Sequence, residues 1–257
     1  MVVASAEKKV HGQEIILKTK YLYLNLLRTF RPRLILDVGS MDGSDSIRFR
    51  QMSPNSKIIA FEANPYNYSR MKNDPRLART KIEVRNRLVS NKPEKGKFYI
   101  SKGAVAGINS GNMGTSSSMK PVDASDVAEE IEVETTRLDK VIAEAAAPAD
   151  WIALWIDVEG AGYEVLSSAI EVKQQILLLH IEVELAECWV GQKLKNDVIQ
   201  LANELGLVLL ARSDNDKQQD LVMINARLLR ERAWSVRVAM MLTKWLGPAS
   251  SRLLEKL

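Results

Sequence analysis

Residues 33–65 constrain the fold of this chain most, because a strand, a glycine turn, a helix and a second strand follow one another there without interruption. The apolar run at residues 34–38 is typical of a strand buried on both faces, and it stops at Gly39. Residues 44–52 have a helical pattern, and a second apolar run occupies residues 58–61. Two such strands joined by one helix predict a parallel sheet in an α/β domain.

The two acids at the ends of these strands predict an adenosine-containing ligand. Glu62 follows the second strand and lies 25 positions after Asp37. At about this spacing, a carboxylate at the end of a second parallel strand accepts hydrogen bonds from both ribose hydroxyls.

The turn between them, G-S-M-D-G, indicates which ligand is bound. Gly39, Ser40 and Gly43 would let a ligand approach the backbone, while Asp42 and the preceding Asp37 repel phosphate and favour a cation. S-adenosylmethionine carries an ammonium and a sulfonium, so we expect this methyl donor rather than a nicotinamide dinucleotide. The alternative is an ordinary turn whose glycines serve only its shape.

Length and composition suit a soluble globular chain. The 257 residues, 46% of them hydrophobic, allow one large α/β domain with appendages. Cys188 is the only cysteine, which excludes an intrachain disulfide. Residues 1–13 lack the apolar core of a secretory signal, so we expect a cytoplasmic protein.

Charge and periodicity divide the chain into three parts. We expect an N-terminal helical segment packing on the sheet at residues 1–32, a catalytic domain at 33–225 and a basic helical appendage at 226–257. Residues 227–257 carry a net charge of +5, and the rest of the chain carries −1. Because no basic and aromatic interleaving surrounds the expected site, we expect no nucleic-acid partner.

The helical pattern at residues 226–246 places Arg230, Arg237 and Lys244 in one stripe between two apolar faces. This arrangement suggests contact on both sides. The appendage would pack on the domain or on a second subunit, as in a homodimer, or it would make a peripheral contact with an anionic membrane surface.

Further strands complete the expected sheet. Residues 81–90 resemble a third strand whose end would lie near the adenine, with Asn86 and Arg87 as candidate contacts. Residues 207–211 and 220–224 predict an antiparallel hairpin at the end of the domain. The stretch 101–121, rich in Gly, Ser and Asn, is a functional loop or lid, or else a disordered surface insertion.

Two later strands end in acids. The run at residues 151–156 ends at Asp157, with Glu159 two positions on, where ligands lie in an open α/β sheet. Along residues 176–184, alternation places His180, Glu182 and Glu184 on one side of the strand.

In order along the chain, these pieces resemble the FkbM family of S-adenosylmethionine-dependent methyltransferases. The motifs that carry the resemblance are LILDVGSMDGSDS, IIAFEANP, GTSSS at residues 114–118, TTRLDKVI and WIALWIDVEGAGYEVLSSA. The resemblance implies a class I methyltransferase fold: a Rossmann-like, mostly parallel seven-stranded sheet with helices on both faces. It also implies O-methylation of a hydroxyl on a sugar, a glycan or another small hydroxylated metabolite. Trp155 and Gly162 depart from the family pattern, which commonly has Lys and Glu there.

Methyl transfer to a hydroxyl needs a group that assists deprotonation. Asp157, which also borders the donor site, is the best candidate for base or substrate anchor, and Glu159 is second. Glu182 and His180 could help from the neighbouring strand. The alternatives are that the two acids cap the following helix and that His180 is structural. A divalent metal held by Asp157 and Glu182 is the less favoured reading, so we expect none.

Two other functions are compatible with these residues. A donor-binding protein without catalysis would recruit a partner through its C-terminal helix. An RNA ribose methyltransferase is a third reading, supported only by the isoelectric point near 9.0.

Overall fold

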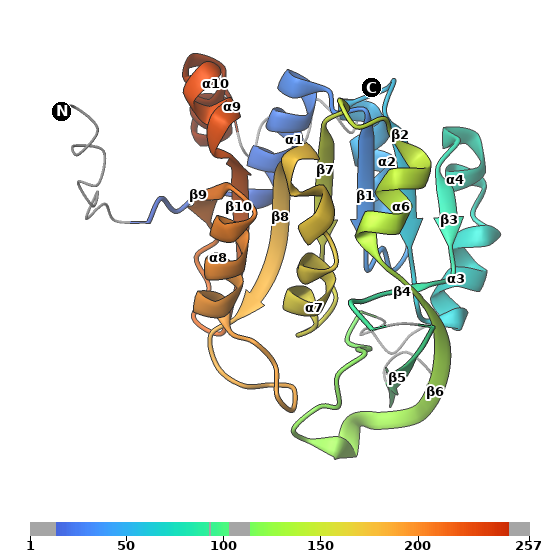
Figure 1. The fold of residues 1–257 in the computed structure, drawn as a ribbon. Coiled ribbons are helices and arrows are strands. Elements are labelled where there is room, and N and C mark those ends of the chain that lie inside the picture. The colour runs from blue at the N-terminus through green and yellow to red at the C-terminus, as the bar shows by residue number, and fades with distance from the viewer. Residues whose placement is uncertain (1–13, 93, 103–113, 247–257) are drawn as a thin grey trace.

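The computed structural model describes residues 14–92, 94–102 and 114–246, and it contains a central seven-stranded sheet (Figure 1). The strand order is β3-β2-β1-β7-β8-β10-β9, and β10 runs antiparallel to both of its neighbours. The strands are β1 (Leu34–Val38), β2 (Lys57–Phe61), β3 (Glu83–Arg85), β7 (Ile152–Ile156), β8 (Ile176–Glu184), β9 (Leu207–Arg212) and β10 (Gln218–Asn225). The expected class I methyltransferase sheet and its C-terminal hairpin are confirmed.

Helices cover both faces of the sheet (Figure 1). One face packs against α1, α2, α9 and α10, and the other against α6, α7 and α8. The helices are α1 (Thr19–Phe30), α2 (Ser44–Met52), α3 (Pro65–Lys72), α4 (Pro75–Thr80), α6 (Leu138–Ala145), α7 (Gly162–Ser167), α8 (Lys195–Glu204), α9 (Ala226–Glu231) and α10 (Ala233–Leu246). Because both faces are covered, all five residues of β1 and of β7 are buried, as their apolar runs predict.

The strand order creates a switch point between β1 and β7. From β1 the chain proceeds to β2 and β3 on one side, and it returns to β7 and β8 on the other. The loops that follow β1 and β7 therefore diverge, and ligands bind in the crevice between such loops in open α/β sheets.

A second sheet of three strands was not expected from the sequence. It has the order β4-β6-β5, with β4 (Leu88–Val89), β5 (Lys95–Ser101) and β6 (Val127–Thr136), and it lies below the carboxyl ends of the main strands in Figure 1. The expected strand at residues 81–90 is split, because Asn86 hydrogen-bonds the carbonyls of Glu62 and Ala63 and turns the chain out of the main sheet. Leu88 and Val89 then pair with β6.

The N-terminal helix begins later than its apolar pattern suggests. Ile15 and Leu17 exchange backbone hydrogen bonds with Arg212 at the end of β9, so the chain is extended there and α1 begins at Thr19. Residues 226–246 likewise form two helices, separated at Arg232. In the described part of the chain, no helix is long and apolar enough to span a bilayer.

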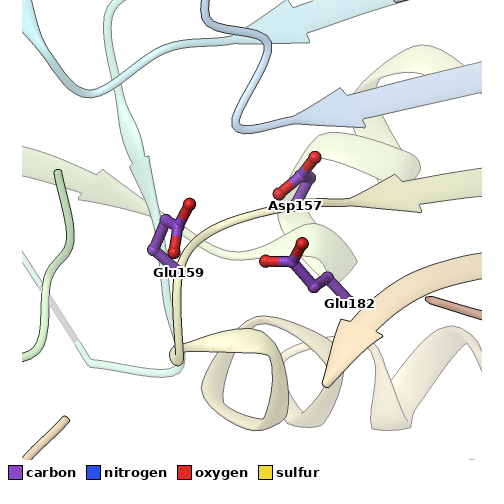
Figure 2. A group of neighbouring side chains, drawn as sticks. All are labelled: Asp157, Glu159 and Glu182. Atoms are coloured by element: carbon purple, nitrogen blue, oxygen red, sulfur yellow. The ribbon is translucent and has the colours of Figure 1, made fainter. Parts of the chain in front are cut away.

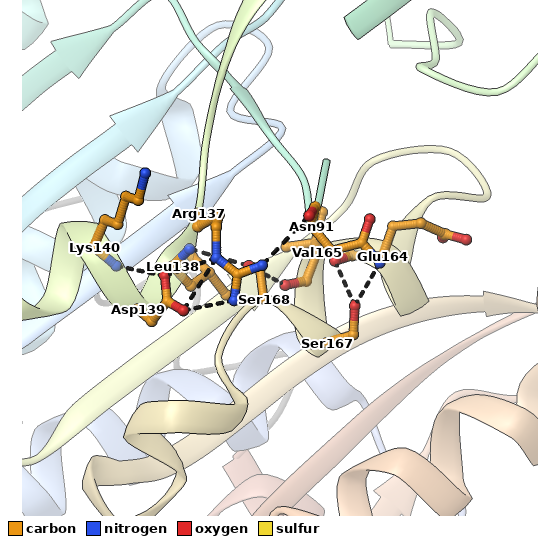
Figure 3. A network of polar contacts seen from close by, with 9 residues as sticks. All are labelled: Asn91, Arg137, Leu138, Asp139, Lys140, Glu164, Val165, Ser167 and Ser168. Carbon is orange, nitrogen blue, oxygen red and sulfur yellow. Dashed lines mark hydrogen bonds and ion pairs between the residues drawn. The ribbon is translucent and has the colours of Figure 1, made fainter. Parts of the chain in front are cut away.

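The segment after β6 anchors α7 (Figure 3). Arg137 donates to the Asp139 carboxylate through Nε and Nη2 and to the Asn91 carbonyl through Nη1, and the Leu138 amide donates to the Ser168 hydroxyl at 3.0 Å. This network holds the carboxyl end of α7, which directly follows the loop that carries Asp157.

Candidate functional site

The glycine turn after β1 fits tightly against the end of β7. Gly39 has a φ of +84°, and a Cβ added there would lie 1.7 Å from the Asp157 carbonyl oxygen. Gly43 has a φ of +75° and lies against Leu77. The turn thus needs glycine for both backbone conformation and space.

Asp37 stabilises the glycine turn after β1. Its carboxylate is buried and accepts hydrogen bonds from the Ser40 hydroxyl at 2.7 Å and the Ser46 hydroxyl at 2.5 Å. Burial raises the pKa of Asp37 to about 7. From the sequence we expect Asp37 and Ser40 to contact the methyl donor. In the structure they hydrogen-bond to each other and stabilise the turn.

Glu62 closes the other side of the turn. Its carboxylate accepts from the Met41 amide and from the Asn64 amide, each at 2.7 Å, and only 6% of the residue is exposed. Burial raises the pKa of Glu62 to about 7. Each carboxylate oxygen can accept more than one hydrogen bond, so capacity for further donors remains.

A cavity opens at the switch point between these elements, with about 520 Å³ of empty space including its mouth. We call it the switch-point cavity. It is lined by Val38, Gly39, Met41, Phe61, Glu62, Ala63, Asn67, Arg87, Leu88, Val89, Phe98, Gly114, Ser116, Ser118, Asp157, Val158 and Ala161. Of the expected donor contacts, Gly39, Glu62, Arg87 and Asp157 line it directly. Gly43 lies behind the turn against Leu77, and Asn86 supports the backbone that follows Glu62.

Three carboxylates gather beside this cavity (Figure 2). Asp157 and Glu159 come from the loop after β7, and Glu182 comes from β8. One oxygen of each lies within 4.8 Å of the others. We call these three residues the acidic triad. Oxygen ligands at this separation could hold a hard divalent cation such as Mg²⁺.

The loop that carries Asp157 and Glu159 is sharply bent. Glu159 has a φ of +51° and Gly160 a φ of +84°. A Cβ on Gly160 would lie 2.2 Å from the Trp189 ring, and the Ser117 hydroxyl donates to the Glu159 carbonyl at 2.5 Å. The backbone of this loop is therefore held from two sides.

Burial and repulsion from neighbouring carboxylates raise the pKa values of all three carboxyl groups. For Glu159 the pKa is raised to about 8, chiefly by burial and then by Asp157. Burial is also the main cause for Asp157 and Glu182, with repulsion from Asp220 contributing to both. The Glu182 Oε1 atom accepts no hydrogen bond from any donor in the described residues. Near neutral pH the triad therefore holds fewer than three negative charges unless a cation joins it.

His180 does not belong to this site. It is 2% exposed and stacks on Trp155 with ring centroids 3.6 Å apart and an interplanar angle of 7°. Tyr23 packs edge-on against both rings. Burial lowers the pKa of His180 to about 3, so the ring is neutral near pH 7, and neither ring nitrogen has a hydrogen-bond partner among the described residues.

The structure adds residues that sequence reasoning did not single out. Asp220 lies directly opposite Glu182 in the β8–β10 ladder, and the Thr19 hydroxyl donates to it at 3.3 Å. Lys20, ion-paired to Asp45 at 2.5 Å, offsets part of the rise in the pKa of Asp157. Asp220 is placed beside Glu182 by the pairing of β10 with β8, and no sequence signal points to Lys20.

Ser116 and Ser118 come from the stretch expected to be a loop or lid. Both line the cavity, and the side-chain amide of Asn64 donates to the Ser116 hydroxyl at 3.5 Å. Residues 103–113 of that stretch lie outside the described residues.

A Glu62→Gln substitution should weaken binding of S-adenosylhomocysteine about 10- to 100-fold, because a neutral amide is a poorer acceptor than a carboxylate. Affinity of the unaltered protein should also fall as the pH drops below about 7, where Glu62 takes up a proton. Titration calorimetry at pH 6 and pH 8 measures both effects. A variant with unchanged affinity at pH 8 would exclude Glu62 from ligand binding.

Comparison with known proteins finds a matching family and a related sequence. The model of the methyltransferase FkbM domain matches residues 37–209. The 2-O-methyltransferase NoeI of Sinorhizobium fredii (strain NBRC 101917 / NGR234) is 27% identical over 201 residues, which cover 76% of this chain and 80% of that protein.

Two solved structures illustrate the similarity at lower identity. Precorrin-6y C5,15-methyltransferase from Geobacter metallireducens GS-15 is 12% identical, with a TM-score of 0.44 over 86% of this chain and 92% of that one. Magnesium protoporphyrin IX methyltransferase from Synechocystis PCC 6803, solved with bound SAM, is 9% identical, with a TM-score of 0.43 over 79% and 76% of the two chains.

Proposed function

Because this chain belongs to the FkbM methyltransferase family, we propose that it methylates a hydroxyl group of a sugar, a glycan or another small hydroxylated metabolite. The chain is a methyltransferase, and its methyl donor is S-adenosyl-L-methionine. The 2-O-methyltransferase relative supports oxygen as the atom that receives the methyl group.

The residues of the switch-point cavity fit this donor. Glu62 offers a carboxylate to a ribose, and Gly39 lines the cavity with backbone alone. Arg87 and Leu88 line the cavity beyond the end of β3, where an adenine would lie. When bound, the donor supplies a methyl group on a positively charged sulfur.

Asp157 is the residue that we assign as general base. It lines the cavity and also belongs to the acidic triad, so it lies between donor site and acceptor site. As a carboxylate it accepts the proton of the acceptor hydroxyl while that oxygen bonds to the methyl carbon and the carbon–sulfur bond breaks. Burial raises its pKa towards neutrality, which suits a base that must accept a proton in water near pH 7.

Glu182 and Glu159 have supporting roles in this scheme. Glu182 lies on the neighbouring strand within reach of Asp157, where it can hold a proton and orient the Asp157 carboxyl group. Glu159 completes the triad and offers a hydrogen-bond acceptor to a second hydroxyl of the substrate. A metal ion shared by these oxygens would orient the acceptor hydroxyl in the same place.

The single observation that carries the proposal is the acidic triad at the edge of the switch-point cavity. Carboxylates accept hydrogen bonds from the several hydroxyls of a sugar, whereas they repel the phosphates of a nucleic acid. Asp220 adds a fourth carboxyl group next to Glu182. A neutral polyhydroxylated acceptor therefore suits this site better than RNA does.

The test is to incubate the purified protein with methyl-labelled donor and fractionated cell extract, with neutral oligosaccharides and RNA as separate acceptors. We expect base-stable label in the glycan or small-metabolite fraction. Label in RNA would overturn the proposal, as would label on nitrogen or carbon of the product. Binding of donor without label in any fraction would favour the donor-binding protein without catalysis.

A further inference from the structure

Helix α10 presents two tryptophans to solvent on one face. Trp234 is 76% exposed, Trp245 is 79% exposed, and Met241 between them is 53% exposed. The spacings of seven and four residues place all three on one stripe of the helix. Arg237 and Lys244 are exposed along one edge of the stripe. We call these five residues the tryptophan face.

The opposite side of α10 is fixed against the domain. Val236, Ala239 and Thr243 are buried, and the Asn25 side chain of α1 donates to the Thr243 hydroxyl at 3.0 Å. Since this packing sets the rotation of the helix, the tryptophan face points away from the protein. Large aromatic side chains that remain exposed in this way usually mark a contact surface.

The surroundings of the tryptophan face are basic. The exposed residues Arg227 and Arg230 of α9 and Arg232 after it precede this face, and the nearby acid Glu231 is paired with Arg227 at 2.8 Å. Beyond the described residues, the sequence adds Arg252 and Lys256 against Glu255. A two-fold contact between copies of this face would bring like charges together, so charge disfavours a homodimer here and favours an anionic partner.

We propose that the tryptophan face docks on an anionic lipid bilayer, with Trp234, Met241 and Trp245 in the interfacial region and Arg237 and Lys244 on lipid phosphates. Tryptophan prefers the boundary between acyl chains and head groups, and basic residues at the edge of an amphipathic helix bind anionic lipids. The proposal does not depend on the methyl acceptor.

The position of α10 has a consequence for the catalytic site. Figure 1 shows α10 at the end of the sheet opposite the carboxyl ends of the parallel strands. The acidic triad lies at those carboxyl ends. Docking through the end that carries α10 would localise the enzyme and leave the switch-point cavity uncovered at the other end.

Vesicle sedimentation of the protein with residues 1–257 tests the proposal. We expect binding to phosphatidylcholine vesicles that contain phosphatidylserine, and little binding to phosphatidylcholine alone. The double variant Trp234→Ala/Trp245→Ala should bind about tenfold or more weakly, and Arg237→Gln/Lys244→Gln should lose the dependence on phosphatidylserine. The control Val122→Ala/Lys140→Gln removes an exposed apolar and an exposed basic group elsewhere and should bind as the unaltered protein does.

Binding of S-adenosylhomocysteine reports folding of each variant and should stay unchanged. Three results would overturn the proposal: no binding of the unaltered protein to anionic vesicles, equal binding by the tryptophan variant, or a dimer in light scattering that the tryptophan variant converts to monomer. The last result would identify a second copy as the occupant of this face.

Discussion

Replacing Asp157 with asparagine should lower kcat for methyl transfer by about 10²- to 10⁴-fold, the contribution typical of a positioned general base. Asparagine keeps the size of the side chain but cannot accept the proton of the acceptor hydroxyl. Because Asp157 is also crowded by other carboxyl groups, loss of its charge should leave the fold intact or slightly more stable. The measurement is single-turnover transfer of labelled methyl at saturating donor.

Two controls make this result specific. Asp216→Asn removes an exposed carboxylate in the turn between β9 and β10 and should leave kcat unchanged. Affinity of the Asp157 variant for S-adenosylhomocysteine, together with its thermal unfolding, separates loss of chemistry from loss of structure. Turnover near that of the unaltered protein in a folded variant would remove Asp157 as the base.

A chelator distinguishes a proton acceptor from a metal ligand at the same position. If Asp157 acts directly as base, EDTA should leave turnover unchanged. If EDTA abolishes turnover and Mg²⁺ or Mn²⁺ restores it, then Asp157 and Glu182 hold a cation, and the Asp157 variant should need more of that metal.

Gly39→Ala should destabilise the protein by about 4 kcal/mol or more, enough to abolish donor binding in most preparations. The added methyl group would lie 1.7 Å from the Asp157 carbonyl oxygen, so β1 and β7 would have to separate at the switch point. Backbone strain at a φ of +84° adds about 1 to 2 kcal/mol to that overlap. Urea unfolding followed by far-UV circular dichroism measures the loss.

Gly206→Ala is the matched control for this substitution. Gly206 has a similar φ of +79°, but nothing lies within 4 Å of the added methyl group. That variant should lose only about 1 to 2 kcal/mol from backbone strain. If Gly39→Ala and Gly206→Ala lower the free energy of unfolding by the same amount, then the close approach of Gly39 to Asp157 does not contribute. Backbone strain alone would then explain why position 39 needs glycine.

Local patterns in the sequence predicted most of the main sheet. Buried strands such as β1 and β7 show as continuous apolar runs, and the residues that end them lie at the carboxyl edge whatever the strand order. Asp157 and Glu62 could therefore be assigned to the site. The second sheet was missed because β4 has two residues, and its pairing with β6 depends on partners more than forty positions away.

Orientation of side chains was harder to predict than position along a strand. Asp37 lies in the last part of β1 and Glu62 directly follows β2, yet Asp37 is enclosed by Ser40 and Ser46 while Glu62 faces the cavity. His180 and Glu182 lie on the same side of β8, but Tyr23 of α1 covers His180, whereas Glu182 lies beside the cavity. Which of two such residues remains accessible depends on how far a helix extends over the sheet.

The sequence alone determined most strands of the main sheet, the acidic two-glycine turn and the acids near the strand ends, because each depends on residues that are close together in the sequence. Only the tertiary structure decided that Asp157, Glu159 and Glu182 meet, since this requires β7 and β8 to pair in register. It likewise decided which face of α10 stays exposed, because packing of Val236 and Ala239 on the domain selects one of two apolar faces. Contacts between segments that are distant in the sequence determine both features, and the sequence alone does not show which segments come into contact.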